Sequence, residues 1–268
     1  MIRWVANISM LFTEVPLMAR FERAARAGFR YVEYLFPYDL DLDEVAAELR
    51  HHGLEQVLFN LPAGDWAAGE RGIAVDPSRR EAFREGVERA VEAALRLGVR
   101  RVNCLVGRRP AEVPEADQRA CLVDNLRHAA DRLGRHGIVL LVEPVNDQDV
   151  PGYYLTTTRQ ALALLDEVAR DNVLIQYDAY HMQIMEGNLT HTLRTHLSRI
   201  GHVQIADVPG RHQPGTGEIR YPFVLKALDE AGYGGFVSLE YVPLGSTEAS
   251  LREAAAAGLD ALGLPHPD

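Results

Sequence analysis

The feature that most constrains the fold of this chain is a regular alternation of short apolar runs with longer amphipathic segments, repeated along its 268 residues. Eight apolar runs are predicted to form strands: RWVANIS (3–9), YVEYLF (31–36), EQVLFNL (55–61), RVNCLVG (101–107), IVLLVE (138–143), VLIQYD (173–178), HVQIAD (202–207) and FVSLEY (236–241). Segments between them have helical periodicity, among them 17–28, 42–53, 78–98 and 124–137. Each of these four ends in glycine, which is common at helix C-termini.

Eight strand and helix repeats in about 250 residues predict parallel pairing of the strands. They close most simply into a single (β/α)8 TIM barrel of the α/β class, with residues 1–268 forming one domain. The competing arrangement is an open, doubly wound sheet, which usually has a glycine-rich phosphate-binding turn after its first strand. The corresponding segment here, NISMLFTEVP (7–16), contains no glycine. The barrel is therefore favoured.

Charge and composition limit the partners of the chain. Its 28 basic and 38 acidic residues give a formal net charge of −10, which opposes binding to phosphate backbones. The N-terminal MIRWVANISM is too short and too polar for a secretory signal, and no apolar run approaches the roughly 18 residues of a membrane span. Cys104 and Cys121 lack C-x-x-C spacing and are typical of a reducing compartment. We expect a cytoplasmic protein with no nucleic-acid partner and no membrane partner.

Carboxylates stand where several predicted strands end. In LVEPVND, Glu143 directly follows the apolar run Val139–Val142, and a buried carboxylate is costly unless it is paired, hydrogen-bonded or bound to a metal. Asp178 ends the sixth strand, Glu240 lies at the end of the eighth, and Gln204 lies near the end of the seventh. The C-terminal ends of barrel strands form one rim, where active sites are built. These four side chains are therefore expected to converge.

Two interpretations of this rim remain open. Each carboxylate could pair with an Arg or Lys side chain or with a helix N-terminus. Alternatively, a divalent cation offsets the repulsion among the carboxylates. Carboxylate and amide oxygens are hard ligands, suited to Mg²⁺ or Mn²⁺. Recurrence of the pattern on neighbouring strands favours the cation.

Three further residues are candidates for substrate binding. His181 follows Asp178 by three positions and could donate to a substrate oxygen or to a ligating carboxylate, although an isolated loop histidine is also a common structural residue. Arg71 lies in the long loop 61–78, which is either an active-site lid or a surface excursion. Arg211 lies in the Gly- and Pro-rich loop 206–221, where its guanidinium could bind a carboxylate through two hydrogen bonds.

At these residues the chain resembles hydroxypyruvate isomerase and the related 2-oxo-tetronate isomerase, within the xylose isomerase-like barrel superfamily. The resemblance spans the whole length. Its most specific segments are NLPAGDWAAGERGIA (60–74) and HVQIADVPGRHQPGTGEI (202–219), and the segments LVEPVN (141–146), QYDAYHMQIMEG (176–187) and SLEY (238–241) are shared more widely. The resemblance implies a divalent metal held by Glu143, Asp178, Gln204 and Glu240. It also implies that Glu143 and Glu240 are the catalytic acid/base pair.

The implied activity is that of a metal-dependent aldose–ketose isomerase of carbohydrate metabolism. A proton moves between adjacent carbons of hydroxypyruvate, through an enediolate stabilised by the metal, to give tartronate semialdehyde. Related ketose 3-epimerases carry histidine at the position of Gln204, which favours the hydroxypyruvate branch. Zinc endonucleases that share the barrel need a histidine-rich metal cluster and a basic surface, whereas this chain is acidic and its ten histidines are scattered.

Three alternatives stay open after the resemblance is considered. They are a 2-oxo-tetronate isomerase, a ketose 3-epimerase and a small-molecule-binding barrel without catalysis. In each case the partner is a small 2-oxo or hydroxy acid or a ketose. The oligomeric state also stays open, a homo-oligomer included.

Overall fold

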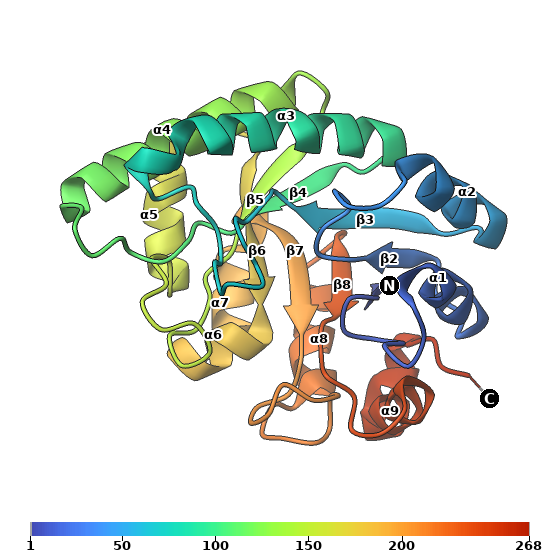
Figure 1. Ribbon diagram of the computed structural model, residues 1–268. Helices are drawn as coiled ribbons and strands as arrows, with labels where there is room; N and C mark the ends of the chain where they lie inside the picture. The colour runs from blue at the N-terminus through green and yellow to red at the C-terminus, as the bar shows by residue number, and fades with distance from the viewer. Residues whose placement is uncertain (1, 268) are drawn as a thin grey trace.

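The computed structural model describes residues 2–267, in which eight parallel strands pair in sequence order and close into a barrel, with β1 beside β8 (Figure 1). The strands are β1 (Arg3–Asn7), β2 (Tyr31–Glu33), β3 (Glu55–Asn60), β4 (Arg101–Cys104), β5 (Val139–Val142), β6 (Val173–Asp178), β7 (Ile200–Ile205) and β8 (Phe236–Leu239). Every predicted strand is present, and the prediction of a (β/α)8 TIM barrel is confirmed.

Helices surround the barrel in the described part of the chain. They are α1 (Leu17–Arg26), α2 (Leu42–His52), α3 (Arg80–Leu97), α4 (Glu115–Gly134), α5 (Thr158–Val168), α6 (Ala179–Met185), α7 (Leu189–Thr195), α8 (Tyr221–Glu230) and α9 (Thr247–Ala254). The two longest, α3 and α4, run side by side along one flank (Figure 1). Among residues 2–267, no helix combines the length and the apolar character that a membrane span needs.

Local sequence signals explain both ends of α2. The Asp41 side chain accepts hydrogen bonds from the first backbone N–H groups of α2, and Gly53 ends that helix in the left-handed conformation at φ 65°. The predicted start of the fourth helical segment, at residue 124, was wrong because α4 begins at Glu115, directly after Pro114. Proline tolerates this place since the first helical turn leaves its backbone donors unpaired.

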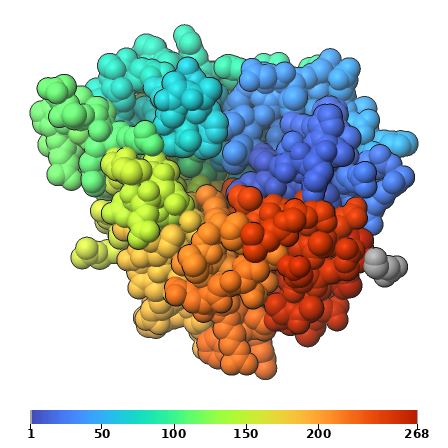
Figure 2. Space-filling model, turned by 60° about the horizontal axis from the view of Figure 1, so that its bottom comes forward, coloured from blue at the N-terminus to red at the C-terminus, as the bar shows by residue number. Residues whose placement is uncertain are grey.

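The two ends of the described chain meet where the barrel closes. The Trp4 indole donates to the Leu262 carbonyl at 3.1 Å, and Arg3 Nε donates to the Gly235 carbonyl at 3.3 Å. Figure 2 accordingly shows C-terminal residues in red against N-terminal residues in blue. Cys104 and Cys121 are both buried and unpaired, and burial raises the pKa of the Cys104 thiol to about 12. The two cysteines therefore serve as core residues.

Candidate active site

The C-terminal ends of the strands carry a ring of buried polar side chains. In strand order they are Asn7, Glu33, Asn60, Asn103, Glu143, Asp178, Gln204 and Glu240. None of these eight is more than 5% exposed. Because water cannot solvate them, their polar atoms need partners within the protein.

Glu143 lies directly after β5 and has two oxygens in different environments. Its Oε2 accepts hydrogen bonds from Asn103 Nδ2 and Gln176 Nε2, both at 2.9 Å. Its Oε1 lies 3.9 Å from His181 Nε2, and the residue lines the cavity at the mouth of the barrel. One oxygen is thus held by amides of the barrel interior, and the other is left for chemistry.

Asp178 and Glu240 repeat this arrangement. Asp178 Oδ1 accepts from the Tyr180 backbone N–H at 2.9 Å, and Glu240 Oε1 accepts from Asn7 Nδ2 at 3.0 Å. Their other oxygens both contact Arg211 Nη2, which lies 3.1 Å from Asp178 Oδ2 and 2.7 Å from Glu240 Oε2. Each of the three acidic side chains therefore directs one oxygen toward a shared space.

Gln204 reaches the same group of residues through its neighbours. Its Nε2 donates to Glu33 Oε1, and its Oε1 accepts from Gln176 Nε2, both at 2.8 Å. Gln176 in turn holds Glu143. The structure places the three predicted carboxylates around Arg211 and His181, and it links Gln204 to Glu143 through the Gln176 amide.

The carboxylates carry more negative charge than their surroundings neutralise. Burial, then repulsion by Asp178, raises the pKa of Glu143 to about 8. Burial also raises the pKa of Glu240 and of Asp178, and Arg211 opposes this only in part. A single guanidinium among three acids leaves a site that favours protons or a further cation. With an amide oxygen nearby, this donor set fits a divalent ion such as Mg²⁺ or Mn²⁺.

His181 is neutral and directs one N–H toward the acids. Asn146 Oδ1 accepts two backbone N–H groups, so its Nδ2 faces His181 Nδ1, at 2.7 Å. The Nδ1 atom therefore accepts, and Nε2 carries the proton 3.5 Å from Asp178 Oδ2. Burial, with Arg211 nearby, lowers the pKa of this imidazole well below its usual value. Glu143, Asp178 and His181 each offer a ligand atom within 4.8 Å of the others.

Arg71 lies on the wall of the same cavity, which has a volume of about 430 Å³. Its guanidinium stacks on Trp66 at 3.9 Å from the ring centroid, and Nη1 donates to the Trp66 carbonyl at 3.1 Å. The loop is joined to the chain after β4 by a bridge between Gly72 and Val106. The loop 61–78 thus forms a fixed wall of the cavity, which agrees with an active-site role.

The loop after β7 is built to place Arg211. Asp207 is buried and accepts hydrogen bonds from the backbone N–H groups of Val208, Gly215 and Ile219. Arg211 adopts a φ of 58°, and its carbonyl accepts from the Val242 N–H after β8 at 2.8 Å. This uncommon backbone conformation turns the guanidinium onto the carboxylates.

Sequence reasoning missed the side chains that hold the acids in place. Asn7, Asn103 and Gln176 are uncharged, and nothing distinguishes them in the sequence from ordinary strand residues. Glu33 had a usable signal, because it is a carboxylate within the apolar run YVEYLF, as Glu143 is within LVEPV. The same test applied to all eight strands would have found it.

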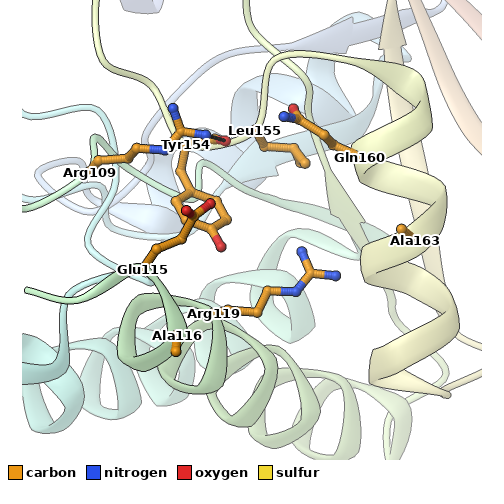
Figure 3. Close-up of a pocket in the computed structure, with 8 residues that line it drawn as sticks. All are labelled: Arg109, Glu115, Ala116, Arg119, Tyr154, Leu155, Gln160 and Ala163. Atoms are coloured by element: carbon orange, nitrogen blue, oxygen red, sulfur yellow. Dashed lines mark hydrogen bonds between the residues drawn. The ribbon is translucent and has the colours of Figure 1, made fainter.

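A second hollow of about 330 Å³ lies between α4 and α5, away from the carboxylates (Figure 3). It is lined by Arg109, Glu115, Arg119, Tyr154 and others. Arg109 Nη2 donates to the Tyr154 carbonyl at 3.2 Å, and Arg119 pairs with Glu167 at 2.7 Å. Its arginines are therefore already engaged, and the carboxylate rim is the better candidate for an active site.

Comparisons with known proteins identify relatives of the chain. The family described as xylose isomerase-like TIM barrel matches residues 21–263. The chain is 53% identical to hydroxypyruvate isomerase of Escherichia coli K12, over 94% of this chain and 98% of that one. It is 43% identical to 2-oxo-tetronate isomerase of Cupriavidus necator, over 93% and 96% of the two chains.

Among solved structures, a crystal structure described as AP endonuclease, family 2, from Brucella melitensis is 45% identical and has a TM-score of 0.93. The alignment covers 96% of this chain and 99% of that one. An L-ribulose 3-epimerase structure shares 25% identity and a TM-score of 0.76, over 96% of this chain and 86% of the other. The predicted family and the predicted isomerase class are confirmed. The chain is an enzyme that belongs to the hydroxypyruvate isomerase family of the xylose isomerase-like TIM barrels.

Proposed function

We propose that this chain is a divalent metal-dependent isomerase that interconverts hydroxypyruvate and tartronate semialdehyde. The observation that carries the proposal is the common arrangement of Glu143, Asp178 and Glu240, each with one oxygen held by the protein and one directed to a shared space. With Gln204, these residues would hold Mg²⁺ or Mn²⁺, and the ion would stabilise the negative charge of an enediolate. Identity of 53% with a hydroxypyruvate isomerase supports the choice of reaction.

The reaction requires two proton movements, which the two glutamates are placed to perform. One proton leaves C3 of hydroxypyruvate and one is added to C2, while the hydroxyl proton of O3 is replaced by one on O2. Glu143 and Glu240 both line the cavity, and each keeps an oxygen free of amide donors. A carboxyl group whose pKa is raised toward neutrality is suited to both donation and acceptance. His181 Nε2 would donate to a substrate oxygen.

Two arginines are available for the carboxylate of the substrate. Arg211 is in contact with Asp178 and Glu240, so its guanidinium stands next to the reacting carbons in the proposed complex. Arg71 lines the same cavity from the loop 61–78 and stacks on Trp66. We assign the clamp to Arg211, since two parallel hydrogen bonds would orient C2 and C3.

A 2-oxo-tetronate is the second candidate substrate. The cavity, about 430 Å³, falls within the range of roughly 300–1,000 Å³ common for small-molecule sites and has room beyond a three-carbon acid. Relatives named 2-oxo-tetronate isomerase are 40–44% identical to this chain. A ketose 3-epimerase is disfavoured by Gln204, and an endonuclease by the net charge of −10.

The setting of the enzyme is part of the same proposal. We place it in the cytoplasm as one catalytic domain, with a small-molecule substrate and no nucleic-acid or membrane partner. Two unpaired, buried cysteines and the acidic composition support this setting.

Proton NMR in D₂O with Mg²⁺ tests the function. The purified chain is mixed in turn with hydroxypyruvate, a 2-oxo-tetronate and a free ketose. We expect deuterium at C2 of the product from hydroxypyruvate, and no exchange after chelation of the metal with EDTA. Exchange with the ketose alone would replace the proposal by an epimerase, and no exchange with any substrate would leave only a binding protein.

A further inference from the structure

A fourth acid, Glu33, lies in the ring but faces away from the cavity. It ends β2, and it is 1% exposed. Its Oε1 accepts hydrogen bonds from Gln204 Nε2 at 2.8 Å and from Asn7 Nδ2 at 3.0 Å. Its Oε2 lies 2.7 Å from Nε2 of His202, which is itself fully buried. Glu33 thus contacts one residue of the proposed metal site directly and reaches another through Asn7.

The contact with Gln204 decides which way that amide faces. An ionised carboxylate accepts hydrogen bonds and has no proton to donate, so the Nε2 end of Gln204 has to face Glu33. The Oε1 end then faces the opposite way, where it accepts one hydrogen bond from Gln176. A carbonyl oxygen has two lone pairs, so a second remains for a cation. With no acceptor at position 33, the amide could rotate and present N–H groups to the cation instead.

The contact with Asn7 orients Glu240 in the same manner. Asn7 Oδ1 accepts from the Ser9 backbone N–H at 3.1 Å, which fixes the amide with its Nδ2 toward the ring. The two protons of Nδ2 then go to Glu33 Oε1 and to Glu240 Oε1. Glu240 is left with Oε2 toward the shared space.

The second oxygen of Glu33 is directed away from these two amides. Oε2 lies 2.7 Å from Nε2 of the buried His202, so Oε1 is left to accept hydrogen bonds from both Gln204 and Asn7.

We infer that Glu33 is a positioning residue whose carboxylate orients Gln204 and Glu240 for the cation. The inference rests on the proposed metal site and adds a residue from β2 to it. Partners that orient metal ligands commonly contribute about 10–100-fold to metal affinity.

Calorimetric titration with Mn²⁺ tests the inference. Glu33→Met keeps the unbranched shape of the side chain and removes its oxygens. We expect Mn²⁺ affinity to fall by about 10–100-fold, with a loss of kcat at saturating Mn²⁺. Glu33→Gln retains one acceptor oxygen and is expected to recover most of the affinity.

Gln56→Met is the matched control. Gln56 is also 1% exposed, on the neighbouring strand β3, but its amide donates to the Leu58 carbonyl. We expect this variant to lose thermal stability and keep its affinity for Mn²⁺. If Gln56→Met weakens Mn²⁺ binding as much as Glu33→Met does, the effect is one of general stability and the inference is overturned.

Other outcomes are equally decisive. A folded Glu33→Met with affinity within twofold of wild type overturns the inference while leaving the metal site in place. A wild-type chain that binds no Mn²⁺ overturns both. If Glu33→Met does not fold, Asn7→Leu removes the link between Glu33 and Glu240, together with the hydrogen bond from the Ser9 backbone, and leaves the contact of Glu33 with Gln204. Unchanged Mn²⁺ affinity and kcat in that variant would also overturn the inference.

Discussion

At the level of single residues, Asp178 and Glu240 both accept a hydrogen bond from Arg211, but their substitution should impair different steps. Asp178→Ala removes a fully buried residue of the proposed ligand set, so Mn²⁺ binding should weaken by more than the roughly 10–100-fold expected for an outer partner. Glu240→Gln keeps an oxygen donor and loses proton transfer, which should cost about 10²–10⁴-fold in kcat. Mn²⁺ calorimetry and steady-state kinetics separate the two effects. A Glu240→Gln variant with near wild-type turnover would make Glu240 a ligand only.

Arg211 should control the choice of an acid substrate. Arg211→Lys keeps the positive charge but loses the planar pair of donors. We expect kcat/KM for hydroxypyruvate to fall by about 10²-fold, since a small misplacement of the substrate has that effect. Affinity for Mn²⁺ should stay unchanged or rise, because the guanidinium donates hydrogen bonds to Asp178 Oδ2 and Glu240 Oε2 and so competes with a cation for these oxygens.

Steady-state kinetics of this variant, with Mn²⁺ calorimetry beside it, provides the measurement. Unaltered kcat/KM would eliminate Arg211 as the clamp and transfer the role to Arg71, for which Arg71→Lys is the matching variant.

The raised pKa of Glu143 predicts how stability depends on pH. The pKa is about 8 in the folded chain, above its usual value of 4.5, so folding favours the protonated carboxyl. The resulting contribution to stability is complete below the unfolded pKa and is lost as pH rises through the folded pKa. With EDTA present, the melting temperature should fall between about pH 5 and pH 8, and Glu143→Gln should flatten part of this decline. Identical pH profiles for the two proteins would refute the expectation.

At the level of elements, the wall formed by loop 61–78 depends on a close approach at Gly72. This residue has a φ of 113°, and a Cβ atom added there would lie 2.0 Å from the Leu105 carbonyl oxygen. Gly72→Ala should therefore displace the loop with Arg71 and Trp66, raise KM for hydroxypyruvate several-fold and lower thermal stability. Gly234→Ala is the control, because its Cβ would meet open space. Equal kinetics for the two variants would show that the wall does not contact substrate.

Most of the elements could be predicted from the sequence because each strand is a short apolar run between amphipathic helices. The acids were found by the same logic, since Glu143 interrupts a run that is otherwise suited to burial. The hydrogen bonds between strands could not be predicted. Asn7 and Glu240 are 233 positions apart, and only closure of the barrel brings them together. The position of Arg211 depends on a positive φ in an irregular loop, for which local sequence offers no periodicity.

At the level of the whole molecule, the two halves of the barrel contribute different residues to the proposed site. The proposed ligands all come from β5–β8, whereas Asn7, Glu33 and Asn103 come from β1, β2 and β4. Hydrogen bonds connect the two groups at Asn103 with Glu143, at Glu33 with Gln204, and at Asn7 with Glu240. The first half of the chain therefore makes hydrogen bonds with three of the four proposed ligands, beside those that Gln176 and Tyr180 donate from the second half, and the proposed site requires the closed ring.

Because a hydrogen bond holds one oxygen of each glutamate, the site also determines the configuration of the product. Addition of a proton to the planar C2 carbon of the enediolate creates a stereocentre. Glu143 and Glu240 are each held by a hydrogen bond, so either one can reach only one face of that carbon. We expect the tartronate semialdehyde to form as one enantiomer. Reduction with borodeuteride as it forms places deuterium at C3 of the glycerate that comes from tartronate semialdehyde and at C2 of the glycerate that comes from remaining hydroxypyruvate. Chiral chromatography with mass spectrometry of the C3-labelled glycerate measures the configuration. A racemic product of the first turnovers would mean that the proton reaches both faces of C2 from solvent. A single enantiomer would mean that the proton comes from an acid that the barrel holds in place.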